Sequence, residues 1–233
     1  MKKLLILKTL TLLFISTISF YSCGNDDEPQ EPTVDPNAII EFTDPNFKAT
    51  LLIHGTRIFS LDGKITIIDT NNDGEIQVKE AEAYTGRIYT GDLYRISDLT
   101  GLEYFKNITE LFSSNGLLTS INVSENHKLE KIEIRDNQLT QIDLSKNPLL
   151  KELNVISNQL NILDLKNNPM LTTVYSSGNK LTSLNIANGN NQNLNIFETY
   201  SNPNLYCIQI DPNFTPPLNW NKDATASYSD NCQ

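Results

Sequence analysis

The chain has 233 residues, enough for one elongated domain with a cap at each end. Its 28 acidic residues outnumber its 18 lysines and arginines, which gives a formal net charge of −10. This charge argues against nucleic acid or anionic lipid headgroups as direct ligands, because both are themselves negatively charged. High solubility is the simpler explanation of the acidic composition.

Residues 1–22 have the composition of a secretion signal. A basic start leads into an apolar run that is too short to remain as a membrane-spanning helix. The run ends at Ser22-Cys23, and a cysteine directly after a small residue at this place resembles the lipobox of bacterial lipoproteins. The resemblance implies cleavage before Cys23 and acylation of its thiol and new amine, which would give a lipid anchor. An ordinary signal peptide cut nearby, or a free Cys23, is the alternative.

Residues 23–38 predict a tether, because they combine acidic residues and prolines with almost nothing apolar. Removing residues 1–22 would take away three lysines and no acid, so the mature chain would be still more acidic. The short run Asn25–Glu28 resembles the export signal of surface lipoproteins in the Bacteroidetes. That resemblance implies the outer face of the outer membrane, whereas an acidic linker with no sorting role is the alternative.

Residues 39–107 are predicted to form an N-terminal cap. A helix is expected from Asp44-Pro45 to about Ile53, because proline is tolerated at the first helical position and three apolar residues then share one face: Phe47, Leu51 and Leu52. Residues 65–68 are strand-like. Residues 86–107 keep the apolar spacing of a coil and lead into the first full repeat.

The most specific chemical motif is DTNNDGEIQVKE at residues 69–80. Its oxygen-bearing side chains at positions 1, 3 and 5, its glycine at 6, its apolar residue at 8 and its glutamate at 12 resemble the calcium loop of EF-hand proteins. Calcium requires six to eight hard oxygen ligands. The resemblance implies these ligands: Asp69, Asn71, Asp73, the backbone carbonyl of Glu75, Gln77 directly or through water, and a bidentate Glu80.

A tight turn without an ion is the alternative for this loop. Residues 78–84 predict the helix that leaves it, but residues 65–68 do not look like the helix that should precede it, and the sequence contains no second loop to pair with it. A lone loop favours a structural ion over a sensor, because the opening motion of calcium sensors belongs to paired loops.

Residues 118–180 contain one 21-residue phrase three times: LTSINVSENHKLEKIEIRDNQ, LTQIDLSKNPLLKELNVISNQ and LNILDLKNNPMLTTVYSSGNK. Each copy holds two runs of the form apolar-x-x-apolar-x-apolar-x-x-Asn, and the last run has Ser176 at its third apolar position. Apolar residues two apart share one side of an extended strand, and the asparagine marks a turn. Each copy therefore predicts one coil with two extended sides, which must stack on its neighbours because one coil alone buries too little.

The pattern resembles the leucine-rich repeat family, in a short bacterial form with strand-like convex segments. The expected fold is an α/β solenoid, mostly β, with repeats over residues 108–210, and residues 86–107 resemble the segment that leads into such repeats. The buried asparagines are expected to bond backbone groups of the neighbouring coil. In the coil that starts at Leu181, the asparagine position holds Gly189, and three extra residues precede the next coil.

Residues 211–233 predict a C-terminal cap, because an open solenoid end would expose its core. Four apolar side chains are expected to cover that end: Phe214, Leu218, Trp220 and Tyr228. With Cys23 assigned to lipid, Cys207 and Cys232 remain as one pair in an oxidising compartment and are predicted to form a disulfide. Two free thiols are the alternative.

The sequence shows no combination of nucleophile and base and no glycine-rich phosphate loop, and neither histidine, His54 or His127, has ligand spacing to a cysteine. The chain is therefore not expected to be an enzyme. The family resemblance places the Leu129, Leu150 and Leu171 segments on the inner sheet, where outward side chains with the aromatic and arginine content of a recognition surface predict a ligand-binding face: Phe112, Glu133, Arg135, Asn154, Ile156, Tyr175, Glu198 and Tyr200.

The predicted function is that of a cell-surface lipoprotein of the outer membrane that binds or adheres to a protein or a glycan through this face. A structural or scaffold lipoprotein, part of a larger envelope complex, is the alternative. The aromatic residues would then be scattered surface residues on a fold that must expose one face.

Overall fold

The computed structural model describes residues 34–53, 67–91 and 95–232. By its internal contacts the chain divides into two units, residues 1–33 and 34–233, of which the second is described below. The predicted signal peptide, the lipidation site Cys23 and most of the predicted tether lie outside the described residues, as does His54. Among the residues described, no helix combines the length and the apolar character needed to cross a membrane.

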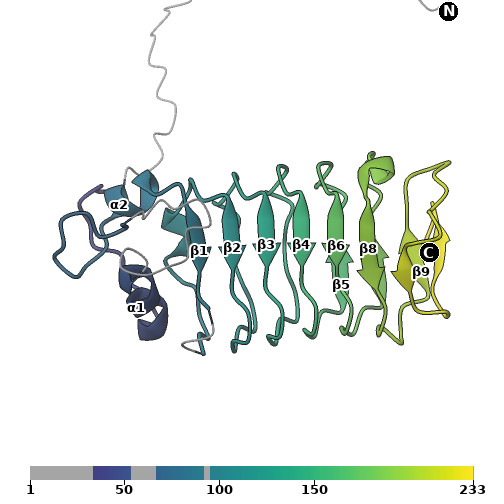
Figure 1. Ribbon diagram of the computed structural model, residues 1–233, viewed down its shortest axis with the longest axis horizontal. Coiled ribbons are helices and arrows are strands. Elements are labelled where there is room, and N and C mark those ends of the chain that lie inside the picture. Colours follow the sequence, from purple (N-terminus) through teal and green to yellow (C-terminus); the bar gives the residue numbers. More distant parts are fainter. Residues whose placement is uncertain (1–33, 54–66, 92–94, 233) are drawn as a thin grey trace, which may run out of the picture. The chain divides into compact units, whose positions relative to one another are not determined.

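Residues 86–91 and 95–232 form a solenoid built from two parallel sheets, so the predicted mostly β repeat fold is confirmed (Figure 1). The long sheet has seven strands, in spatial order β1 (Arg87–Tyr89), β2 (Glu110–Phe112), β3 (Lys131–Glu133), β4 (Glu152–Asn154), β6 (Thr173–Tyr175), β8 (Ile196–Thr199) and β10 (Asn221–Lys222). The short sheet has four: β11 (Ser227–Ser229), β9 (Cys207–Gln209), β7 (Ser183–Asn185) and β5 (Ile162–Asp164).

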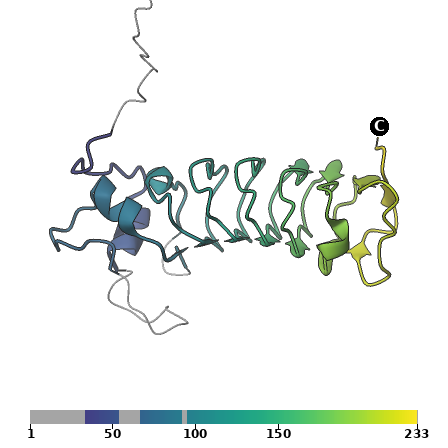
Figure 2. The ribbon, with the colours of Figure 1, turned by 90° about the horizontal axis from the view of Figure 1, so that it is seen from above.

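Successive coils place equivalent apolar residues in register, which is why a 21-residue repeat gives a continuous core. Ile132 of β3 pairs with Leu153 of β4, and Leu153 pairs with Val174 of β6. All three side chains are fully buried. Figure 2 shows the chain winding through these coils one after another. The first two convex segments, around Val123 and Leu144, face the same core without forming strands.

The repeated asparagines bond the backbone of the preceding coil, as the sequence predicts. In the turns that follow the long sheet, the side-chain oxygen of Asn158 accepts the Leu139 N–H at 3.0 Å, and its amide donates to the Ile134 carbonyl at 2.7 Å. In the other turns, the Asn147 amide donates to two carbonyls of the preceding coil. Each coil is therefore tied to the next by polar as well as apolar contacts.

The coil that starts at Leu181 corrects one expectation. Its asparagine position is filled by Asn191 and not by Gly189, because the short 3₁₀ helix η2 (Asn191–Asn193) absorbs the extra residues. Asn191 is fully buried, its amide donates to the Ile186 carbonyl at 2.6 Å, and its oxygen accepts the Asp211 N–H at 2.8 Å. Asn191 therefore bonds its own coil and the next one, while Asn188 makes the bond to the preceding coil by donating to the Asn168 carbonyl at 2.9 Å.

At the C-terminal end, β10 and β11 add one more strand to each sheet beyond residue 210. Trp220 is buried there, its indole N–H donates to the Leu194 carbonyl at 3.2 Å, and its ring lies 4.9 Å from that of Phe197. Phe214 and Tyr228 pack against the same core. Leu218 does not: its side chain is fully exposed, so its predicted role as cover is wrong. The predicted disulfide between Cys207 and Cys232 is present.

The N-terminal cap contains two short helices, α1 (Pro45–Ile53) and α2 (Val78–Ala83), and a 3₁₀ turn, η1 (Leu102–Tyr104). Helix α1 has the predicted bounds, and Asp44 caps it by accepting the Asn46 N–H at 2.8 Å. Ile67 and Ile68 lie in irregular backbone and not in the predicted strand, whose first two residues are outside the described part of the chain.

Candidate functional site

The central residues of the predicted ligand-binding face form one row across the long sheet. Strand pairing aligns them in this order: Phe112, Glu133, Asn154, Tyr175 and Glu198. Each of these side chains is half-buried. The residue that precedes each of them along its strand points to the core and is buried. We call the surface made by these outward side chains, with the rows on either side of them, the long-sheet face.

The flanking residues of the prediction lie beside this row, in the turns that follow the strands. Arg135 and Tyr200 are exposed and Ile156 is half-buried. Between Ile156 and Tyr200 stands Ser177, which is only 2% exposed. The fold therefore brings all eight predicted residues to one face of one sheet.

A third row of the long-sheet face is missing from the sequence prediction. It consists of the first residue of each strand, in register order Arg87, Glu110, Lys131, Glu152, Thr173 and Ile196. Side chains two apart on a strand share a face, so the alternation that identified the central row also identifies these residues. This row changes the charge of the face, because it brings two cations and two carboxylates to it.

The half of the long-sheet face on β1 to β4 is occupied by contacts within the molecule. Arg87 pairs with Glu110 at 2.5 Å and Lys131 with Glu152 at 2.6 Å. The Phe112 ring lies beneath both cations, with the Arg87 guanidinium carbon 4.6 Å from the ring centre. Such cation–π contacts contribute about 0.5–1 kcal/mol at exposed sites. Phe112 is therefore less available to a partner than the tyrosines are.

The other half, on β6 and β8, is more open. Ile196 and Tyr200 are each 41% exposed, and Tyr175 lies directly opposite Glu198 in the sheet. Among the described residues, the Glu198 carboxylate makes no hydrogen bond and no ion pair. Exposed aromatic rings beside an unpaired charge are typical of binding surfaces.

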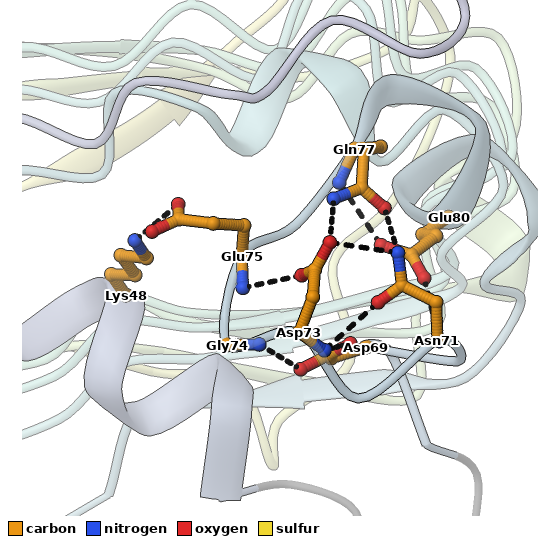
Figure 3. Close-up of polar contacts among 8 residues, drawn as sticks. All are labelled: Lys48, Asp69, Asn71, Asp73, Gly74, Glu75, Gln77 and Glu80. Carbon is orange, nitrogen blue, oxygen red and sulfur yellow. Dashed lines mark hydrogen bonds and ion pairs between the residues drawn. The ribbon is translucent and has the colours of Figure 1, made fainter.

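In the predicted calcium loop, side-chain oxygens accept hydrogen bonds from backbone N–H groups of the same loop (Figure 3). Asp69 accepts the N–H groups of Asp73 and Gly74 at 3.2 and 2.9 Å. Asp73 in turn accepts the Glu75 N–H at 2.8 Å. Gly74 has a φ of +81°, a conformation that favours glycine. The loop backbone is therefore held in a tight turn by hydrogen bonds to its own carboxylates.

Glu80 closes the loop from the first turn of α2. One of its oxygens accepts the Thr70 N–H at 2.8 Å, and the other accepts the Gln77 N–H at 3.0 Å. Burial raises the pKa of Glu80, but these hydrogen bonds outweigh it and leave the pKa below its usual value. The bond from the Glu75 N–H likewise lowers the pKa of Asp73. Both carboxylates are therefore ionised at neutral pH.

The donor set of the loop fits a hard cation. The Asn71 amide donates to Asp73 at 2.8 Å and to the Gln77 oxygen at 3.1 Å, and the Gln77 amide donates to the same Asp73 oxygen at 3.0 Å. Rotating the two amides would present oxygens in place of these N–H groups. The Glu75 side chain points away from the loop to Lys48, so its carboxylate is not among the proposed ligands (Figure 3).

In this conformation the carboxylates do not gather by themselves. In the described part of the chain, no three His, Cys, Asp or Glu side chains form a group that could hold a metal ion. Binding would therefore require the loop to close further around the ion, with the amides as ligands. The loop is supported from outside, since Ile40 N–H donates to the Ile76 carbonyl at 2.9 Å and Val78 N–H to the Ala38 carbonyl at 3.0 Å.

No protein-family model matches the chain, and no curated protein matches it. Among solved structures, the functional domain of InlJ from Listeria monocytogenes is similar, with a TM-score of 0.54 and 21% identity over 75% of this chain and 39% of that one. The internalin InlF from Listeria monocytogenes str. 4b F2365 matches with a TM-score of 0.38 and 20% identity, over 63% of this chain and 41% of that one.

The chain thus spans about two-fifths of the length of these structures. Internalins are leucine-rich repeat proteins, and the likeness to InlJ agrees with the parallel sheets and asparagine ladders described above. The chain has the leucine-rich repeat fold.

Proposed function

We propose that the chain is a binding or adhesion module that recognises a protein or a glycan through its long-sheet face. The observation that carries this proposal is the open half of the face, where the exposed Ile196 of β8 and Tyr200 directly after β8 lie beside the half-buried Tyr175 on β6. Burying such side chains against a partner removes apolar surface from water. The likeness to internalin structures supports the fold on which this face is built.

The test begins with a screen of protein and glycan arrays, in which the native protein is used to find a binding partner. Variants of the long-sheet face are then measured for loss of binding to that partner. Replacing Tyr175 and Tyr200 together by Ala should weaken the binding free energy for that partner by roughly 1 kcal/mol or more, as at interface hot spots. Tyr206→Ala is the matched control, because Tyr206 is 64% exposed but precedes β9 of the short sheet. If the control weakens binding and the double variant does not, the long-sheet face is not the binding surface.

We further propose lipid anchoring at Cys23 and display at the exterior of the outer membrane, on the strength of the sequence resemblances. Mass spectrometry of the mature N-terminus should show an acylated cysteine, and protease added to intact cells should remove the domain. A protein resistant to protease in intact cells but sensitive in lysed cells would favour the envelope scaffold over the surface binder.

Calcium is proposed as a structural ion of the N-terminal cap. Asp69, Asn71, Asp73, Gln77 and Glu80 would hold it together with one backbone carbonyl, that of residue 75. When bound, the ion would supply a positive centre that draws the loop oxygens together. The protein supplies the loop that would hold the ion. Hydrogen bonds join this loop to the segment before α1 and to the first turn of α2.

A further inference from the structure

Glu198 differs from the other carboxylates of the long-sheet face because it has no partner. On the β1 to β4 half, the carboxylates Glu110, Glu152 and Glu133 pair with Arg87, Lys131 and Arg135 respectively. Glu198 makes no such contact among the described residues. The face is thus neutralised by its own ion pairs at one half and carries an uncompensated negative charge at the other.

The sheet also keeps lysine away from Glu198. Lys222, on the neighbouring strand β10, aligns with the buried Thr199 and not with Glu198. Its ammonium group donates to the Ala226 carbonyl and lies 5.4 Å from the centre of the Tyr228 ring. The residue that does align with Glu198 is the uncharged Asn221. The carboxylate is therefore left for a cation that comes from outside the molecule.

Two tyrosines are neighbours of Glu198 on the same face of the sheet. Tyr175 lies opposite Glu198 on β6, about 5 Å away across the sheet, and Tyr200 follows two residues later with 41% of its surface exposed. Beside Tyr200, the buried hydroxyl of Ser177 has no hydrogen-bond partner. A carboxylate beside two tyrosines, with a spare hydroxyl nearby, offers both charge pairing and cation–π contact.

We infer that this half of the long-sheet face binds an arginine side chain of a partner protein, seated on Glu198 between Tyr175 and Tyr200. The inference rests on the proposed binding function and names its partner class. A planar guanidinium can stack on tyrosine while it bonds a carboxylate. A net charge of −10 attracts basic partners. A neutral glycan would offer the Glu198 carboxylate hydroxyl hydrogen bonds but no opposite charge, whereas a guanidinium offers both.

The test uses two small probes, N-acetylarginine amide and its uncharged isostere N-acetylcitrulline amide, titrated into ¹⁵N-labelled protein. The arginine probe should shift the backbone resonances of residues 175–177 and 196–200. Glu198→Gln should weaken this binding about threefold or more, as expected for one charge pair supported by aromatic contact. The citrulline probe should bind the native protein as weakly as the arginine probe binds the variant.

Glu152→Gln is the matched control, because it removes the same charge from the same face but from a carboxylate that already has a partner. It should leave the titration unchanged. Equal weakening by both variants, or equal binding of both probes, would overturn the inference. If the arginine probe fails in these ways while the Tyr175 and Tyr200 double variant still loses its array partner, the proposed binding function stands and the partner is of another class.

Discussion

One backbone position recurs through the coils in the left-handed conformation. It is occupied in turn by Asn115, Asp136, Ser157, Gly178 and Ser201, with φ between 54° and 68°. In the first four of these residues the N–H donates to a carbonyl of the next coil, as in the bond from Gly178 to Tyr200 at 3.0 Å. Non-glycine residues tolerate this conformation at a cost of about 1 kcal/mol, so the bond between coils takes precedence over local preference.

Replacing Gly178 by Ala should therefore lower the free energy of unfolding by about 1 kcal/mol. An added Cβ would lie 3.5 Å from the Ser157 nitrogen, an ordinary contact, so the cost comes from φ and not from a clash. Urea unfolding measures it. Ser157→Gly at the preceding coil is the reciprocal control and should be neutral or slightly stabilising. Equal destabilisation by both variants would contradict the conformational explanation.

Asp44 links α1 to the segment before the first coils. Its carboxylate accepts the Asn46 N–H and also the Ser97 N–H at 2.7 Å and the Ser97 hydroxyl at 3.0 Å. Burial raises the pKa of Asp44, but these bonds outweigh it and hold the pKa below its usual value of 3.8. The ionised form therefore stabilises the fold above about that pH, and the contribution is lost as the pH falls through the lowered pKa.

Asp44→Asn should reduce the free energy of unfolding at pH 7 by roughly 1–3 kcal/mol, the usual range for a cap and for hydrogen bonds to a charged group. The difference between the native protein and the variant should shrink as the pH falls below about 3.8, because the pKa of Asp44 is lowered from that value in the folded protein. Urea unfolding at a series of pH values measures both effects. A difference that stays constant with pH would show that packing, and not charge, explains the loss.

At the scale of elements, the sequence predicted what periodicity and local chemistry determine. The repeats, the start of α1 at Pro45 and the cysteine pair follow from spacing and parity. Asn191 was missed because an insertion shifts the register, and only the contacts show that Asn188 bonds the preceding coil while Asn191 bonds the next one. Leu218 was misplaced because hydrophobicity alone does not say which residues of a proline-rich loop turn inward.

The long-sheet face, like the fold, was predictable from the sequence only in part. Its central row follows from the alternation of side chains along each strand. The division into a paired half and an open half does not, because it depends on which charges meet across strands. The pairing of Lys131 with Glu152, for example, joins residues 21 positions apart and requires the register that the stacked coils create.

The proposed calcium site in the loop of residues 69–80 can be tested by thermal unfolding. Calcium should raise the thermal midpoint relative to chelator, because an ion bound only by the native state stabilises it, by about 2.7 kcal/mol at 100 times its dissociation constant. Calorimetry measures the midpoint. Glu80→Gln should remove most of the response. Glu75→Gln is the matched control and should retain it, since that side chain faces Lys48 and only its carbonyl is a proposed ligand. Equal loss in both variants would place the ion elsewhere.

At the scale of the whole molecule, each coil of a solenoid is stabilised by its neighbours, so its ends are its weak points. The C-terminal end is closed by side chains that replace a missing coil. Ser201 N–H, whose equivalents donate to the next coil's carbonyl, donates instead to Asp223 at 2.9 Å, and Asn202 N–H donates to the same carboxylate at 2.6 Å. The disulfide then joins β9 to the end of the chain.

Removing the disulfide should therefore loosen one end first. The bond joins cysteines 25 residues apart, and on the chain-entropy model such a closure contributes roughly 3–4 kcal/mol. With Cys207 and Cys232 both replaced by Ser, the amides of β9 and β11 should exchange with deuterium much faster. Those of β2 to β4 should change little, because they lie several coils away and nearest-neighbour coupling falls off along the stack. Faster exchange by the same factor in every strand would show instead that the coils unfold as one cooperative unit.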